Sequence, residues 1–460
     1  MTPVERYLTE HRSRFIQELC DYLRFPSISA QPAHAPDMRA CARWLVERCR
    51  AIGLKTELCT TGGNPVVVAR TPRDRRQRKP HFVVYGHYDV QPPDPLDLWD
   101  SPPFEPSIRG DLLFARGSSD NKGQHMAHLN AVEAYFATGT ELPCDLTFVV
   151  EGEEEVGSTH LGRFLRDRKA DLRCEAIVIS DTGIPGREHP ALTYALRGIC
   201  ALEVVVRGPS RDLHSGIFGG CVDNPAMVLC QMLASLRDAK GRITIPGFYD
   251  DVVPIGAYER RQMKRLPFTE RQERRFLGVK QLFGEAGYTF VEQRSARPTC
   301  EINGLTSGYQ GEGSKTIIPS WASAKLTFRL VANQDPSRVA QLVTRHLKKV
   351  CPPTVRLEVK GGHGGAPYML DPKSAFAQAS LRAVRSAFQC EPVLLREGGS
   401  IPIVTDCQRI LGADALLIGL ALPDANAHSP NESFSLSIFD RGMRMSAHLW
   451  PELSKVSRER

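Results

Sequence analysis

Short, continuous apolar runs that alternate with helical stretches constrain the fold of this chain most strongly. These runs have the length of buried β-strands, and they are Pro65–Val68, Phe82–Tyr85, Leu146–Val150, Ala176–Ile179 and Ala415–Leu420. Helical stretches lie between some of them, for example at residues 122–136 and 158–168. Strands that alternate with helices in this way indicate an α/β domain with a mixed, mostly parallel sheet.

The middle of the chain has a different pattern, with alternating apolar runs such as 201–206 and 322–330 beside helical stretches. This pattern favours a smaller α+β domain inserted in the first one. The Gly-rich stretch 361–365 is typical of a hinge that returns the chain to the first domain. The predicted division is therefore a main domain of residues 1–197 and 363–460 and an inserted domain of residues 198–362.

Composition and charge limit which binding partners and which cellular compartment we expect for this protein. The formal net charge of +7 is small for 460 residues, and the basic residues are dispersed, so we expect no nucleic-acid partner. The first residues lack the apolar core of a secretory signal, and no run is long enough to span a membrane, so we expect no membrane partner. Thirteen scattered cysteines without a Cys-x-x-Cys pair predict a cytoplasmic location and argue against a thiolate zinc site.

Histidine and acidic residues follow four of the predicted strands. His87 and Asp89 come after one strand, the acidic run 151–155 after another, Asp181 after a third, and His428 follows the last through a short loop. Ligands of open α/β sheets bind outside the carboxyl ends of the strands, so we expect these side chains to meet at one edge. Asp120, a fifth acidic group, opens a helical stretch.

Each of these residues also has a simpler interpretation when it is taken alone. Asp89 and Asp181 could be turn residues, and Asp120 could be only a helix N-cap. The run 153–155 could be the acidic start of a helix, where negative charge is favourable. His428 alone is typical of a surface or core histidine whose ring nitrogens have hydrogen-bond partners.

Taken together, these residues favour a metal site. Clustered carboxylates repel one another and hold protons unless a cation compensates them. Two histidines with three carboxylates suit a pair of divalent ions, and the predicted ligands are His87, Asp120, Glu155, Asp181 and His428. Three carboxylates and two divalent ions leave a charge of +1, which suits a bound hydroxide, and Glu154 is left as a base beside that water. We expect two Zn²⁺ per subunit, with Mn²⁺ compatible.

Five segments in chain order now identify a resemblance. They are residues 86–90 (GHYDV), 116–123 (RGSSDNKG), 151–158 (EGEEEVGS), 180–181 (SD) and 428–432 (HSPNE). The set resembles the co-catalytic zinc family of carnosinases, glutamate carboxypeptidase, acetylornithine deacetylase and succinyl-diaminopimelate desuccinylase. The likeness covers essentially the whole chain and is greatest to the cytosolic non-specific dipeptidase and carnosinase branch. It implies a phosphorylase/hydrolase-like catalytic domain with a ferredoxin-like lid and dimerisation domain inserted.

The resemblance also implies roles at the metal site. His87 and Asp181 hold one ion, Glu155 and His428 hold the other, and Asp120 bridges them. Asp89 orients His87, and the family pattern selects Glu154 rather than Glu153 as the general base.

An aspartate at position 181 goes with the aminopeptidase and dipeptidase members of the family. The implied function is therefore a metal-dependent dipeptidase, with an N-acyl amino acid deacylase as the alternative. The intact base and ligands argue against a catalytically silent, peptide-binding relative.

The remaining implied roles concern the substrate and the second subunit. His214 reaches the partner's site in a homodimer formed through the lid domain and stabilises the oxyanion in trans. Arg329 clamps the terminal carboxylate of the dipeptide, for which its planar fork is suited. The other expected substrate contacts are Thr316, Ser400 and His428.

Overall fold

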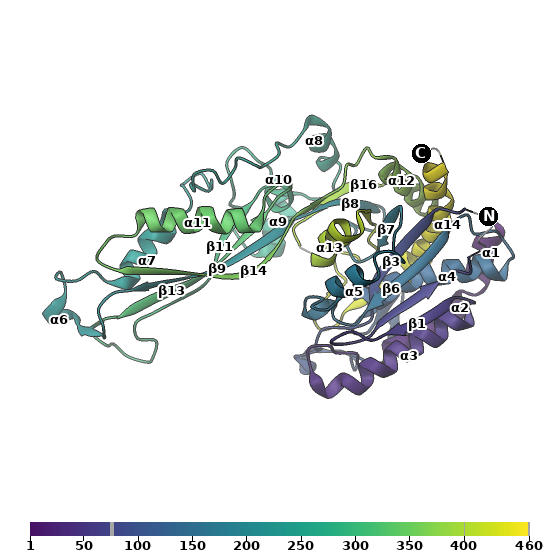
Figure 1. The fold of residues 1–460 in the computed structure, drawn as a ribbon, viewed down its shortest axis with the longest axis horizontal. Helices are drawn as coiled ribbons and strands as arrows, with labels where there is room; N and C mark the ends of the chain where they lie inside the picture. The colour runs from purple at the N-terminus through teal and green to yellow at the C-terminus, as the bar shows by residue number, and fades with distance from the viewer. Residues whose placement is uncertain (74–77, 400, 459–460) are drawn as a thin grey trace.

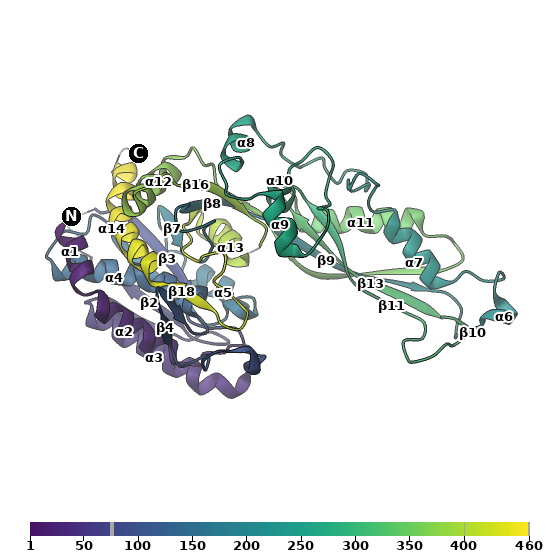
Figure 2. The same ribbon diagram turned by 180° about the vertical axis from the view of Figure 1, so that it is seen from behind.

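The computed structural model describes residues 1–73, 78–399 and 401–458, and its chain forms two lobes (Figures 1 and 2). The large lobe contains the N-terminus and helix α14 (Leu436–Arg458), with which the described chain ends. A narrower, elongated lobe projects from it, and α6 (Ser215–Phe218) lies at its far end. Within the described residues, no helix combines the length and the apolar character that crossing a bilayer requires.

A nine-stranded mixed sheet forms the centre of the large lobe. Its strand order is β1 (Lys55–Cys59), β2 (Val66–Arg70), β6 (Asp145–Glu151), β3 (His81–His87), β7 (Ala176–Ile179), β17 (Asp414–Leu417), β8 (Ala191–Leu196) and β15 (Tyr368–Met369). β16 (Val393–Glu397) also pairs with β8. The central strands β6, β3, β7 and β17 are parallel to one another, whereas β2 and β8 run antiparallel to them. This confirms the predicted mixed, mostly parallel sheet.

The central strands are continuously apolar because helices cover them. Strand β7, for example, is buried at every position, as expected for a parallel strand between two layers. The helices of this lobe are α1 (Pro3–Glu10), α2 (Arg12–Leu23), α3 (Ala35–Ala51), α4 (Gly123–Ala137), α5 (Leu161–Asp167), α12 (Ala375–Phe388), α13 (Pro402–Leu411) and α14 (Leu436–Arg458). Helix α14 packs against both α4 and α12, and α4 is buried along almost its whole length.

The narrow lobe, called the extension below, has a sheet and a core of its own. Its four antiparallel strands lie in the order β11 (Thr299–Ser307), β13 (Trp321–Leu330), β9 (Gly198–Arg207) and β14 (Arg356–Gly365). Burial alternates along β13, which is why this strand appears in the sequence as an alternating run. Helices α7 (Pro225–Ala234) and α11 (Pro336–Val350) pack on the sheet, and their buried side chains complete a second apolar core.

The predicted return hinge coincides with the end of a strand. The glycine run at 361–365 is the end of strand β14, whose backbone pairs with β9 through Gly365. The strand therefore continues three residues beyond the predicted boundary at 362. The two connecting strands approach so closely that a Cβ on Gly198 would lie 2.5 Å from the carbonyl oxygen of Gly365, so only glycine fits there. We propose that the extension begins and ends at this crossing.

One part of the predicted inserted domain packs on the large lobe instead. It comprises α8 (Ala257–Met263), α9 (Glu270–Leu277) and α10 (Phe290–Ala296), and both α8 and α10 contact β16. Leu266 belongs to the core of the large lobe, and the hydroxyl of Tyr194 donates to Glu259 at 2.9 Å. These three helices therefore lie at the junction of the two lobes (Figure 1).

Candidate metal centre

The five predicted ligands lie together, four of them at or after the ends of the parallel strands β3, β6, β7 and β17 and Asp120 in the segment before α4. They form two groups, one of His87, Asp120 and Asp181 and one of Asp120, Glu155 and His428. Within each group the nitrogen and oxygen atoms that could bind an ion lie within 4.8 Å of one another. The side chains that the sequence placed at one edge of the sheet therefore lie close together, and Asp120 belongs to both groups.

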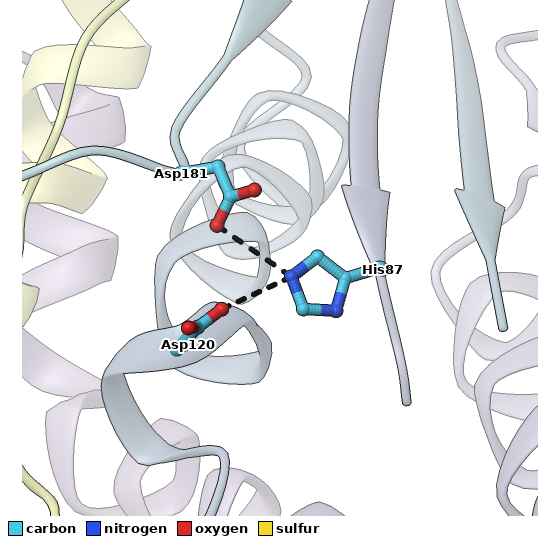
Figure 3. Close-up of side chains that lie close together, drawn as sticks. All are labelled: His87, Asp120 and Asp181. Carbon is cyan, nitrogen blue, oxygen red and sulfur yellow. Dashed lines mark hydrogen bonds and ion pairs between the residues drawn. The ribbon is translucent and has the colours of Figure 1, made fainter. Parts of the chain in front are cut away.

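The first group is centred on His87, the last residue of β3 (Figure 3). Its Nε2 atom lies 3.1 Å from Oδ1 of Asp120 and 3.6 Å from Oδ1 of Asp181. The imidazole is fully buried, and both carboxylates point to the same ring nitrogen. One cation at this point could bind all three side chains.

The second group is built on the other oxygen of Asp120. Nε2 of His428 lies 2.8 Å from Oδ2 of Asp120 and 3.2 Å from Oε2 of Glu155. Each oxygen of the Asp120 carboxylate therefore faces a different histidine. This is the arrangement of a carboxylate that bridges two ions.

Two further residues hold the candidate ligands in place, Asp89 through both its backbone and its side chain and Asn121 through its side chain. Nδ1 of His87 lies 3.0 Å from the carbonyl oxygen of Asp89, and the Asp89 carboxylate accepts the backbone N–H groups of Glu154 at 3.2 Å and Glu155 at 3.1 Å. Asp89 therefore links His87 to the loop that carries the predicted base. The amide of Asn121 donates to Oδ1 of Asp181 at 2.9 Å, and its oxygen accepts the backbone N–H of His87 at 3.3 Å. Such contacts fix the orientation of metal ligands.

The protonation of the cluster reflects an excess of negative charge. Burial raises the pKa of Glu154 to about 9, and the carboxylates of Asp181, Glu155 and Asp120 add to this while His87 opposes it. Hydrogen bonds with Asp120 and Glu155 raise the pKa of His428 to about 10. These raised pKa values mean that protons compensate part of the negative charge of the cluster, as bound cations would. Because all the donors are imidazole nitrogens and carboxylate oxygens, they fit a pair of divalent ions.

Sequence reasoning assigned no role to two acidic residues near the cluster. Glu432 is fully buried and contacts the backbone of Asp120, although it lies in a segment that the resemblance already included. Glu397 ends strand β16 and accepts the backbone N–H of Gly183 at 3.2 Å. Burial raises its pKa to about 7, with Asp181 contributing. Its position at a strand end is the same signal that identified His87, so the sequence could have indicated it.

The predicted substrate residues are not gathered at the cluster. His214 and Thr316 are exposed and lie together, since His214 pairs with Ile317 between β10 (Leu213–His214) and β12 (Ile317–Ile318). They adjoin α6, at the end of the extension remote from β3, β6 and β7 (Figures 1 and 2). Arg329 lies at the opposite end of the extension, paired with Ile199 near the large lobe. Ser400 lies outside the described residues.

Comparison with known proteins places this geometry in a family. The model of peptidase family M20/M25/M40 matches residues 83–452, which include the five candidate ligands. The Cys-Gly metallodipeptidase of Saccharomyces cerevisiae is 34% identical over 395 residues, which cover 84% of this chain and 81% of that protein. The Beta-Ala-His dipeptidase of Homo sapiens is 30% identical, covering 98% of this chain and 92% of that protein.

A solved structure points to the same family as the relatives identified by sequence. The M20 family metallo-carboxypeptidase of Sulfolobus solfataricus is 31% identical to this chain and superposes with a TM-score of 0.82. The superposition covers 96% of this chain and 99% of that one, so both lobes are included. The match to the family model and the identity to these relatives lead to one conclusion: this chain belongs to peptidase family M20/M25/M40.

Proposed function

We propose that the protein is a metal-dependent dipeptidase, which hydrolyses the single peptide bond of a dipeptide. The main support is the pair of ligand groups that share Asp120, because two neighbouring divalent ions suit the attack of water on an amide. The relatives from yeast and man are both named dipeptidases. The ions we propose are two Zn²⁺, with Mn²⁺ as the other candidate for this donor set.

The residues of the chain have separate tasks in this reaction. Ions bound by the five ligands supply a polarised carbonyl and a water of lowered pKa. Glu154 takes a proton from the attacking water and returns it to the leaving amine. Its burial raises its pKa, which makes its carboxylate a stronger proton acceptor than an exposed one. Asp89 keeps Glu154 in place through the backbone N–H of that residue.

The extension provides part of the substrate contacts in this proposal. The guanidinium of Arg329 binds the C-terminal carboxylate, and Thr316, which lies beside His214 at the tip, contacts the dipeptide from the partner subunit. Ser400 and His428 provide the remaining contacts outside the extension. A clamp at one end of the substrate and the metal site at the other limit the length of peptide that fits. The extension then acts as a lid that closes on the substrate and excludes water.

A substrate panel tests this function. Free dipeptides are expected to be cleaved in the presence of Zn²⁺ or Mn²⁺, and their C-terminal amides to be cleaved at least about tenfold less well, because Arg329 loses its anionic partner. Arg329→Lys is expected to raise KM for free dipeptides, since an ammonium group cannot form the bidentate pair. Release of amino acids, followed by chromatography, gives kcat and KM for each substrate.

The same panel separates the proposal from its rivals. Longer peptides are included because a metallo-carboxypeptidase, as the Sulfolobus solfataricus relative is named, removes the last residue of peptides of any length. N-acetyl and N-succinyl amino acids test the deacylase alternative. Cleavage of longer peptides as well as dipeptides, or of acyl amino acids alone, would replace the dipeptidase by the corresponding activity.

We also propose that the active unit is a homodimer in which His214 stabilises the oxyanion in the partner's site. The remote position of His214 and Thr316 supports this, because the tip of the extension is far from the metal cluster of its own chain (Figure 2).

A cytoplasmic location is proposed as well. All thirteen cysteines lie among the described residues and none is disulfide-bonded, as expected in a reducing compartment.

Complementation between two inactive variants tests the action of His214 in trans. Glu154→Gln and His214→Ala are each expected to be inactive alone, but a mixture that exchanges subunits is expected to regain activity. Each mixed dimer then has one complete site, so an equal mixture reaches about a quarter of the wild-type rate. Two inactive proteins that remain inactive after verified subunit exchange would place His214 in its own chain's site, or outside catalysis.

A further inference from the structure

A fully buried carboxylate lies directly behind the bridging ligand. Oε1 of Glu432 accepts the backbone N–H groups of Ser119 and Asp120, both at 3.0 Å, and the hydroxyl of Ser119 at 3.2 Å. Oε2 accepts the backbone N–H of Gly117 and a guanidinium N–H of Arg116, both at 2.8 Å. Five donors from one short segment of chain therefore converge on Glu432.

These contacts compensate for an irregular backbone at Asp120. The segment η3 (Ser118–Lys122) precedes α4, and within it Asp120 has non-helical angles of φ −126° and ψ 91°. The N–H groups of residues 117, 119 and 120 donate to Glu432 instead of to helical carbonyls. Hydrogen bonds to a buried carboxylate are among the stronger ones in proteins. They fix the backbone of Asp120 and hence the direction of its side chain.

Glu432 also joins this segment to the second ligand loop. It lies four residues after His428, and the backbone N–H of Ala115 donates to its carbonyl oxygen at 3.1 Å. Strand β18 (Ser433–Ser435) follows and pairs with β5 (Leu112–Phe114), which leads into the Asp120 segment. The chain on both sides of Glu432 is thus anchored beside Asp120. This brings His428 to within 2.8 Å of the Asp120 carboxylate.

We propose that Glu432 is a positioning residue that holds Asp120 ready to bridge two ions and ties the His428 loop to it. This inference rests on the proposed metal site. A preformed bridging ligand binds ions without a rearrangement of its backbone, so Glu432 contributes to metal affinity although it contacts no ion. Removal of a group that orients a metal ligand typically lowers affinity by about 10- to 100-fold.

Titration of the metal-free protein with Zn²⁺ and with Mn²⁺ tests the proposal, with a chromophoric chelator as competitor. Glu432→Gln keeps the size of the side chain but replaces one acceptor oxygen by an NH₂ group. It is expected to lower metal affinity by about 10- to 100-fold. The matched control is Glu133→Gln, which alters a buried carboxylate of the same lobe that pairs with Arg14 and Arg48. This control is expected to lose stability but to bind metal like the wild type.

A second variant covers the case in which Glu432→Gln does not fold. Glu432→Asp keeps the negative charge beside Arg116 but withdraws the carboxylate from the N–H groups, so a smaller loss of metal affinity is expected. Wild-type affinity in a folded Glu432 variant would overturn the positioning role while leaving the proposed function intact. A wild-type protein that binds neither ion would overturn the proposed function itself.

Discussion

Glu154→Gln is expected to lower kcat for dipeptide hydrolysis by about 10²- to 10⁴-fold, which is the usual contribution of a general base. The amide has nearly the shape of the carboxylate but cannot take a proton from water. Because Glu154 is not among the five candidate ligands, the variant is expected to bind metal as the wild type does. Steady-state kinetics and elemental analysis of the purified variant measure the two quantities.

The neighbouring Glu153 provides the matched control for this experiment. Its carboxylate accepts the backbone N–H of Asn64 at 3.1 Å and lies 2.8 Å from Nδ1 of His160, and it belongs to neither of the two ligand groups. Glu153→Gln is therefore expected to retain most of its activity. If Glu153→Gln is as inactive as Glu154→Gln, or if Glu154→Gln remains active, the assignment of the base is wrong.

Asp120→Asn is expected to weaken the binding of both ions and to abolish hydrolysis. The reason is that the two oxygens of this carboxylate face different histidines, and an amide offers only one oxygen to share between them. The loss of affinity should exceed the roughly 100-fold limit that is typical of groups outside the coordination sphere. Metal content after dialysis against a weak chelator gives the result directly.

Asp181→Asn is the natural comparison, since Asp181 belongs to only one of the two groups. Asp181→Asn is expected to weaken the binding of one ion, while the other ion stays bound. If Asp120→Asn retains both ions, Asp120 does not bridge them. If the two variants lose the same single ion, the two groups do not form two separate binding positions.

The sequence predicted the core of the large lobe and the side chains that gather beside it for a clear physical reason. A parallel strand that is buried on both faces must be continuously apolar, and the polar residues that follow it must lie at the edge of the sheet. His87, Asp181 and Glu155 were found in this way. Neither rule depends on which strands are neighbours, so the prediction did not need the strand order.

Other features could not be predicted because they depend on tertiary contacts. The role of Glu432 arises from five donors of a distant segment, and nothing near it in the sequence marks such a partnership. The helices at 257–296 lie within the predicted insert, yet their side chains pack on β16 of the large lobe. The glycine run at 361–365 has the composition of a hinge, but pairing with β9 keeps it in a strand. Local composition does not report such long-range pairing.

The distance along the chain between the partners of the metal centre determines when a newly made protein can bind its ions. Asp120 and Glu432 are 312 residues apart in sequence, and His428 precedes Glu432 by only four. A nascent chain therefore has no complete second ligand group until the ribosome has passed residue 428. The first group, by contrast, is complete in the chain once residue 181 has been made, so the two candidate positions become available at different stages of synthesis. A candidate site for two ions therefore exists only after almost the whole chain has been made.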